Sequence, residues 1–125
     1  MKLLLDTNVF VRWMAETRLP RGVERLLARA GTETFVSIVT AWEIAMKPKL
    51  GLNAADFEAG IGSMGSTVLP VWFRHLDELS GLATYDEHRD PFDRILIAQA
   101  LAEDLSIVSS DTRFGKYKRL RVIWE

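Results

Sequence analysis

Short, fully apolar runs alternate along this chain with longer stretches of helical periodicity. The run Leu3–Leu5 does not alternate with polar residues, which indicates a strand buried on both faces of a sheet. We predict strands at 2–5, 34–38, 67–71, 106–109 and 121–124. The spacing of apolar residues predicts helices at 7–14, 20–30, 39 or 40 to 47, 56–64, 73–83 and 90–103, with a short helical segment at 111–118.

The helix at 90–103 has the clearest start signal in the sequence. Asp90 can be its N-cap, Pro91 takes the first helical position and Asp93 the third. At other helix ends, Pro48 is expected to stop the helix before it, and Gly31 to end the helix over 20–30. Strands alternating with helices predict an α/β fold with a parallel sheet covered on both faces. A length of 125 residues suits a single domain over 1–125.

The composition excludes several classes of protein. The absence of cysteine excludes disulfides, thiolate zinc sites and thiol nucleophiles. No apolar run is long enough for a transmembrane helix, so we expect no membrane association. The apolar start is short and interrupted by Asp6, so we interpret it as a strand rather than a signal peptide, and expect a cytoplasmic protein. The net charge of −1 is not that of a bulk nucleic-acid binder.

Four acids stand where a buried strand gives way to a helix, or just inside a helix. They are Asp6, Glu43, Asp93 and Asp111. In a parallel sheet the carboxyl ends of the strands share one edge, so these acids are expected to lie together. Their mutual repulsion would require a cation, and the pattern therefore predicts a divalent-metal site.

Helix capping is the competing explanation for each acid taken singly. Asp6, Asp90 and Asp111 all stand where an N-cap is needed. Thr40 can be the N-cap of its helix with Glu43 as capping-box partner, and a lone Glu43 would otherwise be expected to face solvent. Capping explains Asp93 least well, because a second acid adds repulsion to a cap that Asp90 already forms.

Other polar and aromatic residues near these acids can each have either a functional or a structural role. Asn8 either hydrogen-bonds Asp6 and holds its carboxylate or caps the helix. His88, two residues before Asp90, is a candidate general base, but a loop histidine is more often solvated, and we expect that here. Trp13 and Trp42 could stack on bases, whereas their helical spacing favours packing in the core or at an interface.

Four segments together carry a family resemblance. They are Leu4-Leu5-Asp6-Thr7-Asn8, residues 37–45 around Glu43, residues 90–100, and Ser110-Asp111 with Phe114. In this order the chain resembles PIN-domain proteins, and specifically VapC toxins of type II toxin–antitoxin modules. The resemblance implies a PIN-like three-layer fold with a central, mostly parallel sheet flanked by helices. It also implies that Asp6, Glu43, Asp93 and Asp111 are the catalytic and metal-binding quartet, with Asp90 as a further candidate.

The implied activity is that of a metal-dependent endoribonuclease using Mg²⁺, with Mn²⁺ as an alternative. Mg²⁺ prefers oxygen ligands and keeps several waters, so we expect Asp6 and Asp93 to ligate it directly. Glu43 would ligate or position water, and Asp111 would act through water. Nearby Lys and Arg residues would offset repulsion between these acids and RNA phosphates.

The implied partners are an RNA substrate, a cognate antitoxin and a second copy in a homodimer. An apolar groove for an antitoxin helix could be formed by the crowded apolar residues of the first two helices, which could equally be ordinary core. These residues are Val9, Phe10, Trp13, Met14, Leu26 and Leu27.

Other functional classes fit the sequence less well. A response-regulator receiver needs two adjacent acids after the first strand and a lysine on a late strand, but Asp6 has no acidic neighbour and residues 107–110 contain no lysine. A haloacid-dehalogenase-like phosphatase needs a second Asp where this chain has Asn8. The remaining alternative is a catalytically inactive PIN-like module that binds RNA or protein, against which the presence of all four acids weighs.

Overall fold

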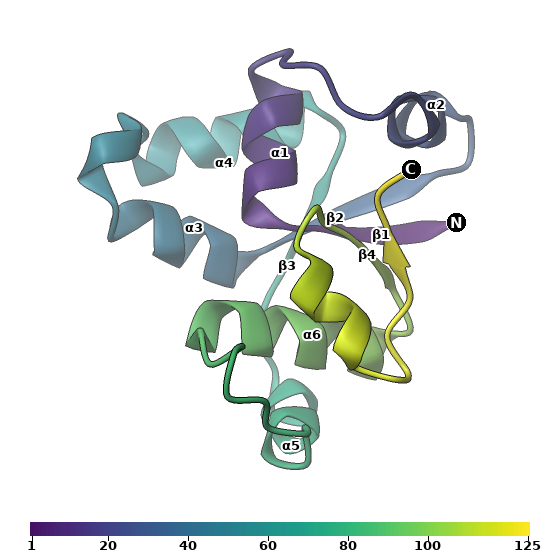
Figure 1. Ribbon diagram of the computed structural model, residues 1–125. Helices are drawn as coiled ribbons and strands as arrows, with labels where there is room; N and C mark the ends of the chain where they lie inside the picture. Colours follow the sequence, from purple (N-terminus) through teal and green to yellow (C-terminus); the bar gives the residue numbers. More distant parts are fainter.

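Five parallel strands form the central sheet of the computed structural model, which describes residues 1–125 apart from the side chain of Leu50 (Figure 1). The strands are β1 (Lys2–Leu5), β2 (Glu33–Ser37), β3 (Thr67–Leu69), β4 (Ser106–Val108) and β5 (Val122–Ile123). Their order is β3-β2-β1-β4-β5, and each neighbouring pair is parallel. The predicted α/β fold with a parallel sheet is confirmed, although the last three strands are shorter than predicted.

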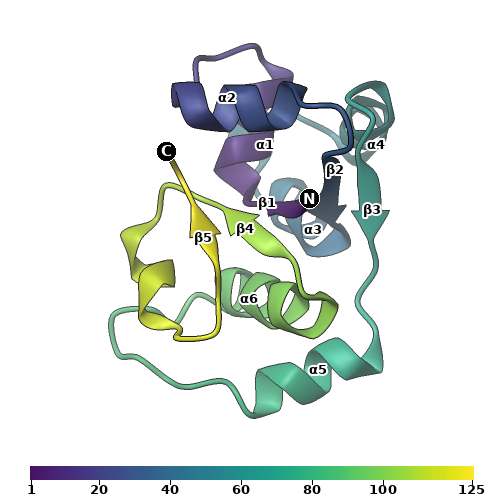
Figure 2. The same ribbon diagram turned by 90° about the vertical axis from the view of Figure 1, so that its right-hand side faces the viewer.

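Helices cover both faces of the sheet. They are α1 (Thr7–Met14), α2 (Arg21–Ala28), α3 (Ile38–Ala45), α4 (Ala54–Ser63), α5 (Phe73–Ser80) and α6 (Pro91–Glu103), with 3-10 turns at Pro48–Leu50 and Thr112–Lys116. Figures 1 and 2 show α1, α2 and α4 on one side of the sheet, with α5 and α6 on the other. This arrangement confirms the predicted three layers. Among the described residues, no helix combines the length and apolar character needed to cross a membrane.

The central strand β1 is apolar throughout because both of its faces are buried. Leu3 and Leu5 pack into a core cluster with Phe10 and other residues beneath α1, α2 and α4. Leu4 points the other way, into a cluster that includes Leu96 of α6. Successive side chains of a strand point to opposite faces, so a strand covered on both sides lacks the usual apolar–polar alternation.

Helix ends differ from the predictions by a few residues. The helix predicted over 20–30 ends at Ala28, and Gly31, with φ +88°, lies in the turn that follows. Pro48 does lie beyond the end of α3, but the helix stops at Ala45 rather than Lys47. The helix predicted over 73–83 ends at Ser80. Helix α6 begins at Pro91 with Asp90 as its N-cap, as predicted.

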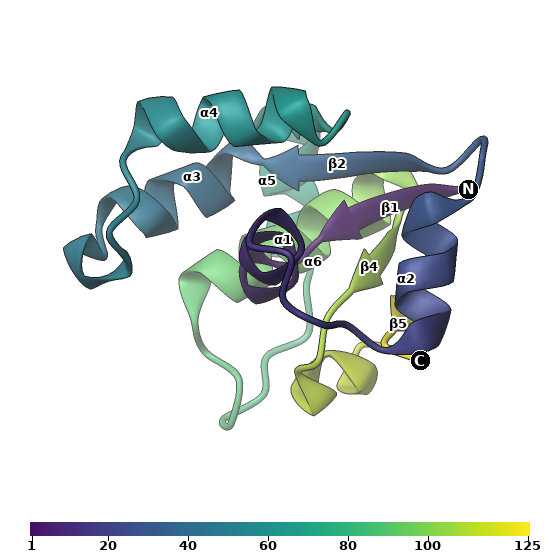
Figure 3. The same ribbon diagram turned by 90° about the horizontal axis from the view of Figure 1, so that it is seen from above.

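The carboxyl ends of β1 and β2 lead almost directly into helices. Only Asp6 separates β1 from α1, and α3 follows β2 without an intervening residue. Seen from above, these helix starts and the start of α6 gather at the same end of the sheet (Figure 3). Residues at the first turns of α1, α3 and α6 are therefore brought together by the topology.

Candidate metal centre

A cleft of about 260 Å³ lies at this edge of the sheet and gathers the predicted acids. Its lining includes Asp6, Glu43, Asp93 and Asp111, together with Asp90. The remaining lining residues are Thr7, Asn8, Lys47, Ser110 and Arg113. Five acids from four separate parts of the chain thus share one small space with two basic side chains.

Asp6 is at once a helix cap and a buried member of this cleft. Its Oδ1 accepts a hydrogen bond from the backbone N–H of Thr7 at 2.8 Å, and its Oδ2 accepts one from the Ser109 hydroxyl at 2.7 Å. Only 8% of Asp6 is exposed, and burial raises the pKa of its carboxyl, with the charges of Glu43 and Asp111 adding to the rise. The two bonds hold the carboxylate in place, so capping and site roles do not exclude each other.

Glu43 is buried in the cleft, and both expectations that gave it a simple structural role are wrong. Ser37 caps α3 by accepting from the N–H of Val39 at 3.0 Å, so Thr40 is not the N-cap and makes no capping box with Glu43. The helix starts earlier than predicted because Ser37 supplies a cap directly at the end of β2.

The Glu43 side chain faces α1 rather than solvent. Only 9% of the residue is exposed. Its Oε1 accepts from the Thr7 hydroxyl at 2.8 Å, and its Oε2 accepts from Lys47 Nζ at 2.6 Å. The hydrogen bond to Glu43 is the main cause of a raised pKa at Lys47. Burial of this carboxylate is therefore compensated by an ion pair.

At the start of α6, Asp90 caps the helix and Asp93 lines the cleft. The exposed Asp90 accepts from the N–H of Phe92 at 2.8 Å and from that of Asp93 at 3.4 Å, and so caps the helix. The Asp93 carboxyl makes neither of these bonds and instead enters the cleft. Burial raises its pKa to about 6, and the charges of Asp6 and Asp90 contribute to the rise.

His88 is fully buried beside Asp93, so its expected exposure to solvent is wrong. Its Nε2 lies 3.1 Å from Asp93 Oδ2. The ring packs against Phe114 and Tyr117, with centroid distances of 5.1 and 5.6 Å. The loop preceding α6 folds back under the 3-10 turn at Thr112–Lys116, and this tertiary contact removes the ring from water.

Asp111 is bound by an arginine from its own turn. Its Oδ1 accepts from the backbone N–H of Arg113 at 2.9 Å, which caps the 3-10 turn as expected. The guanidinium of Arg113 also donates from Nε to Oδ1 at 3.0 Å and from Nη2 to Oδ2 at 2.6 Å. This bidentate pairing lowers the pKa of Asp111. Arg113 Nη2 lies 4.0 Å from Asp93 Oδ2 and so reaches toward a second acid.

A model of the PIN domain family matches residues 3–120 of the sequence. The chain belongs to the PIN domain family. This match spans all five acids of the cleft. The comparison with curated proteins gives no match.

Chains in solved structures of VapBC and FitAcB share the fold of this PIN domain. A chain of VapBC2 from Rickettsia felis, solved with a promoter DNA fragment, is 14% identical, with full coverage of both chains and a TM-score of 0.77. A chain of DNA-bound VapBC from Salmonella typhimurium is 18% identical, covering 98% of this chain and 97% of that one, with a TM-score of 0.69. A chain of FitAcB from Neisseria gonorrhoeae is also 18% identical, covering 97% and 96%, with a TM-score of 0.65.

The side chains of the PIN domain cleft fit a hard divalent cation. The donors are mainly carboxylate oxygens, which Mg²⁺ and Mn²⁺ prefer. Ligand-type atoms of His88, Asp93 and Asp111 all lie within 4.8 Å of one another. Burial is the main cause of the raised pKa values of Asp6 and Asp93, and the charges of neighbouring acids add to the rise. A cation in the cleft would offset these charges.

Several residues of the cleft were not singled out by the sequence. Thr7 and Ser109 hold Glu43 and Asp6, and their only sequence signal is adjacency to a strand end. Arg113 could have been suspected from its position two residues after Asp111. Asn8 lines the cleft as an exposed side chain, whereas Asp6 takes its hydrogen bonds from Thr7 and Ser109.

Proposed function

We propose that this PIN domain is a metal-dependent endoribonuclease, the toxin component of a type II toxin–antitoxin system. The convergence of Asp6, Glu43 and Asp93 with Asp111 in one cleft carries the proposal, because such a cluster needs a cation to be stable. PIN domains are nucleases, which supports the reaction class. The likeness of the fold to chains from VapBC and FitAcB structures supports the toxin assignment.

In this proposal the acids have different tasks. Asp6 and Asp93 hold Mg²⁺, or Mn²⁺, directly, while Glu43 and Asp111 bind it or orient its waters. When bound, the cation lowers the pKa of a coordinated water and offsets the negative charge of a phosphodiester during hydrolysis. Asp90 contributes negative charge at the rim of the cleft and keeps α6 capped.

The hydrogen bonds of the cleft preorganise the acids for this work. The Thr7 backbone and the Ser109 hydroxyl each hold one oxygen of Asp6. The Thr7 hydroxyl holds one oxygen of Glu43. Carboxylates fixed in this way need little rearrangement when they bind a ligand, which favours tight and selective binding.

Lys47 and Arg113 allow a polyanion to approach an acidic cleft. Without a cation, Lys47 pairs with Glu43 and Arg113 with Asp111. A divalent cation that neutralises the acids would weaken both pairs and free the two side chains for RNA phosphates. Substrate binding, and not only catalysis, would then depend on the metal.

Cleavage of RNA by the purified chain, free of any antitoxin, tests the proposal. Wild-type protein should cut RNA in Mg²⁺ or Mn²⁺ and not in EDTA. Asp6→Asn and Asp93→Asn should each reduce the rate by about 10²–10³-fold, since each removes a group that holds the cation. Asp56→Asn is a suitable control, because Asp56 is an exposed acid in the first turn of α4, outside the cleft.

The outcome also separates the enzyme from a binding module. If wild-type protein binds RNA but cuts it with neither metal, the alternative of an inactive PIN-like module is left. If the Asp93→Asn protein is folded and cuts as fast as wild type, the cleft is not the active site. Mapping the new RNA ends would show which sequences are cut.

A hollow between the first two helices is the proposed seat of the antitoxin. Val9 and Phe10, expected as part of such a groove, are buried in the core instead. Trp13 and Leu27 do line a hollow of about 370 Å³, together with Met64. Glu16 and Glu24 lie beside these apolar residues, so the hollow suits an antitoxin segment that is apolar and basic. We also propose that the toxin and antitoxin act in the cytoplasm, where RNA is available as the substrate.

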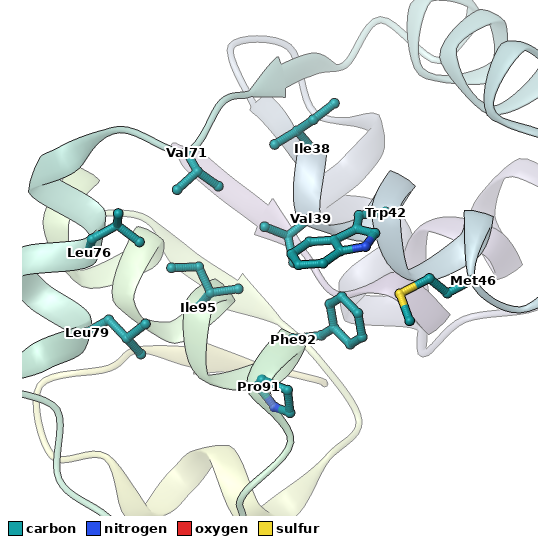
Figure 4. Close-up of a pocket in the computed structure, with 10 residues that line it drawn as sticks. All are labelled: Ile38, Val39, Trp42, Met46, Val71, Leu76, Leu79, Pro91, Phe92 and Ile95. Carbon is teal, nitrogen blue, oxygen red and sulfur yellow. The ribbon is translucent and has the colours of Figure 1, made fainter.

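A second, larger apolar face is the proposed contact between two copies of the chain. A groove of about 620 Å³ lies among α3, α5 and α6 (Figure 4). Ile38 and Trp42 of α3 and Met46, its C-cap, recur at intervals of four residues, and Trp42 is 61% exposed. Trp42 therefore does not lie in the core, and an interface is the remaining one of the two placements expected for it. If two copies of the chain meet about a twofold axis, this apolar stripe packs against the same stripe of the other copy, and both are removed from water.

A further inference from the structure

His88 is a buried histidine whose one polar contact is a carboxylate of the cleft. It is 0% exposed, and its Nε2 lies 3.1 Å from Asp93 Oδ2. Its backbone N–H donates to the carbonyl of Tyr85 at 3.0 Å, and this hydrogen bond fixes the backbone at His88. The faces of the ring pack against Phe114 and Tyr117. The ring is thus held in one orientation from several sides.

The surroundings of the two ring nitrogens decide where the imidazole carries its hydrogen. Nδ1 is buried and has no hydrogen-bond partner among the described residues. A hydrogen on Nδ1 would be a buried donor without an acceptor. The unprotonated Nε2 would then face Asp93 Oδ2, so that two hydrogen-bond acceptors would oppose each other with no hydrogen between them. A hydrogen on Nε2 instead donates to Asp93 Oδ2. The hydrogen-bond network therefore assigns the Nε2–H tautomer.

We propose that His88 is a positioning residue that holds Asp93 in the orientation required to bind the cation. Its bond holds Oδ2, while Oδ1 has no hydrogen-bond partner among the described residues and the Asp93 side chain lines the cleft. Groups behind a metal ligand typically change metal affinity by about 10–100-fold when they are removed. The inference rests on the proposed metal-dependent function, but it concerns the metal site and not the choice of substrate.

The chain contains a matched control at the opposite end of the same helix. His75 is also 0% exposed, and its Nε2 lies 2.9 Å from Glu103 Oε2. Asp93 is in the first turn of α6, and Glu103 is its last residue. Each histidine thus supports one acid of α6, but only His88 lies beside the cleft. His75 Nδ1 also accepts from the backbone N–H of Trp72 at 3.0 Å, so a purely structural contribution should be at least as large at His75 as at His88.

Binding of Mn²⁺ to purified protein, measured by electron paramagnetic resonance or calorimetry, tests the proposal without RNA. His88→Phe keeps an aromatic ring against Phe114 and removes the donor, so it should weaken Mn²⁺ binding by about 10–100-fold. His88→Gln retains an amide N–H that can reach Asp93 and should recover most of the affinity. His75→Phe should change the affinity by less than about twofold, even if it lowers the unfolding temperature.

Several results would overturn the inference. One is unchanged Mn²⁺ affinity in the folded His88→Phe protein, and another is an equal loss in His75→Phe. Should His88→Phe fail to fold, long-range ¹H–¹⁵N correlation spectra of the wild type provide an independent readout. They should show the hydrogen of His88 on Nε2, and an Nδ1–H tautomer would refute the assignment. If wild-type protein cuts RNA and the His88→Phe protein binds Mn²⁺ with normal affinity, the role proposed for His88 is refuted while the proposed nuclease function stands.

Discussion

In metal-free protein at neutral pH, Asp93→Asn is predicted to raise the stability of the fold. The pKa of Asp93 rises from 3.8 to about 6 because the carboxyl is buried beside other acids. This rise corresponds to roughly 3 kcal/mol of preference for the protonated form, at about 1.4 kcal/mol for each factor of ten in proton affinity. The cleft is open to solvent, so screening reduces the expected effect to about 1–2 kcal/mol.

The sign of the pH dependence follows from linkage between protonation and folding. A carboxyl whose pKa is raised in the folded state contributes its stability below its unfolded pKa, near pH 4. That contribution is lost as the pH rises through about 6. Wild-type protein therefore carries the full penalty at pH 7, whereas the asparagine variant does not. The two proteins should differ most at neutral pH and converge near pH 4.

Thermal unfolding in EDTA, recorded from pH 4 to pH 7.5, is the measurement that checks this prediction. At neutral pH the unfolding temperature of Asp93→Asn should exceed that of wild type by roughly 3–8 °C. Saturating Mn²⁺ should reverse the order, because only the wild type gains fully from binding the metal.

Asp56→Asn supplies the control for the loss of a charge at a helix start. Asp56 is the third residue of α4, as Asp93 is of α6, but it is exposed and lies away from the cleft. Its substitution should cost about 0.3–1 kcal/mol through the lost interaction with the helix dipole. If Asp93→Asn is destabilised as much as Asp56→Asn in EDTA, Asp93 stabilises α6 through the helix dipole. The claim that its buried charge destabilises the metal-free protein is then wrong.

Two further predictions concern the dimer face and the buried start of α3. Trp42→Ala should weaken self-association by about 30-fold or more, as expected for a central aromatic residue, whereas Phe73→Ala, also exposed but outside the groove, should not. Sedimentation analysis checks this, and a monomeric wild type would contradict it. Ser37→Ala should cost about 2–3 kcal/mol in urea unfolding, because it removes the α3 cap and the 2.6 Å bond to buried Gln99. Ser63→Ala, at an exposed serine, should cost less than about 0.5 kcal/mol, and a similar loss in both would argue against the predicted role of Ser37.

Short-range patterns predicted the features that depend on neighbouring residues. The apolar run of β1 indicated a strand covered on both faces, and the structure places a helical layer on each side. Asp90 and Pro91 marked the start of α6 because a cap and a first-turn proline act within a few residues. Alternation of strands and helices then required a parallel sheet, which gathers the helix starts at one edge.

The errors lie where several residues compete for the same local role or where a distant segment intervenes. Ser37 and Thr40 are both good caps, and in the structure Ser37, the last residue of β2, caps α3. The helical spacing of Trp42 did not distinguish the core from an interface, and in the structure its ring packs on Phe92 but stays 61% exposed. The burial of His88 depends on the turn at Thr112–Lys116, more than twenty residues further along the chain.

The sequence by itself determined the α/β class, the layer order and the set of acids delivered to one sheet edge, because periodicity, capping and chain direction are local properties. Only the tertiary structure decided how those acids are held. Ser109 meets Asp6 across 103 residues, and Thr7 meets Glu43 across 36. Contacts at such separations depend on the packing of whole elements, and that packing sets both the burial that raises the pKa of Asp93 and the exposure of Trp42.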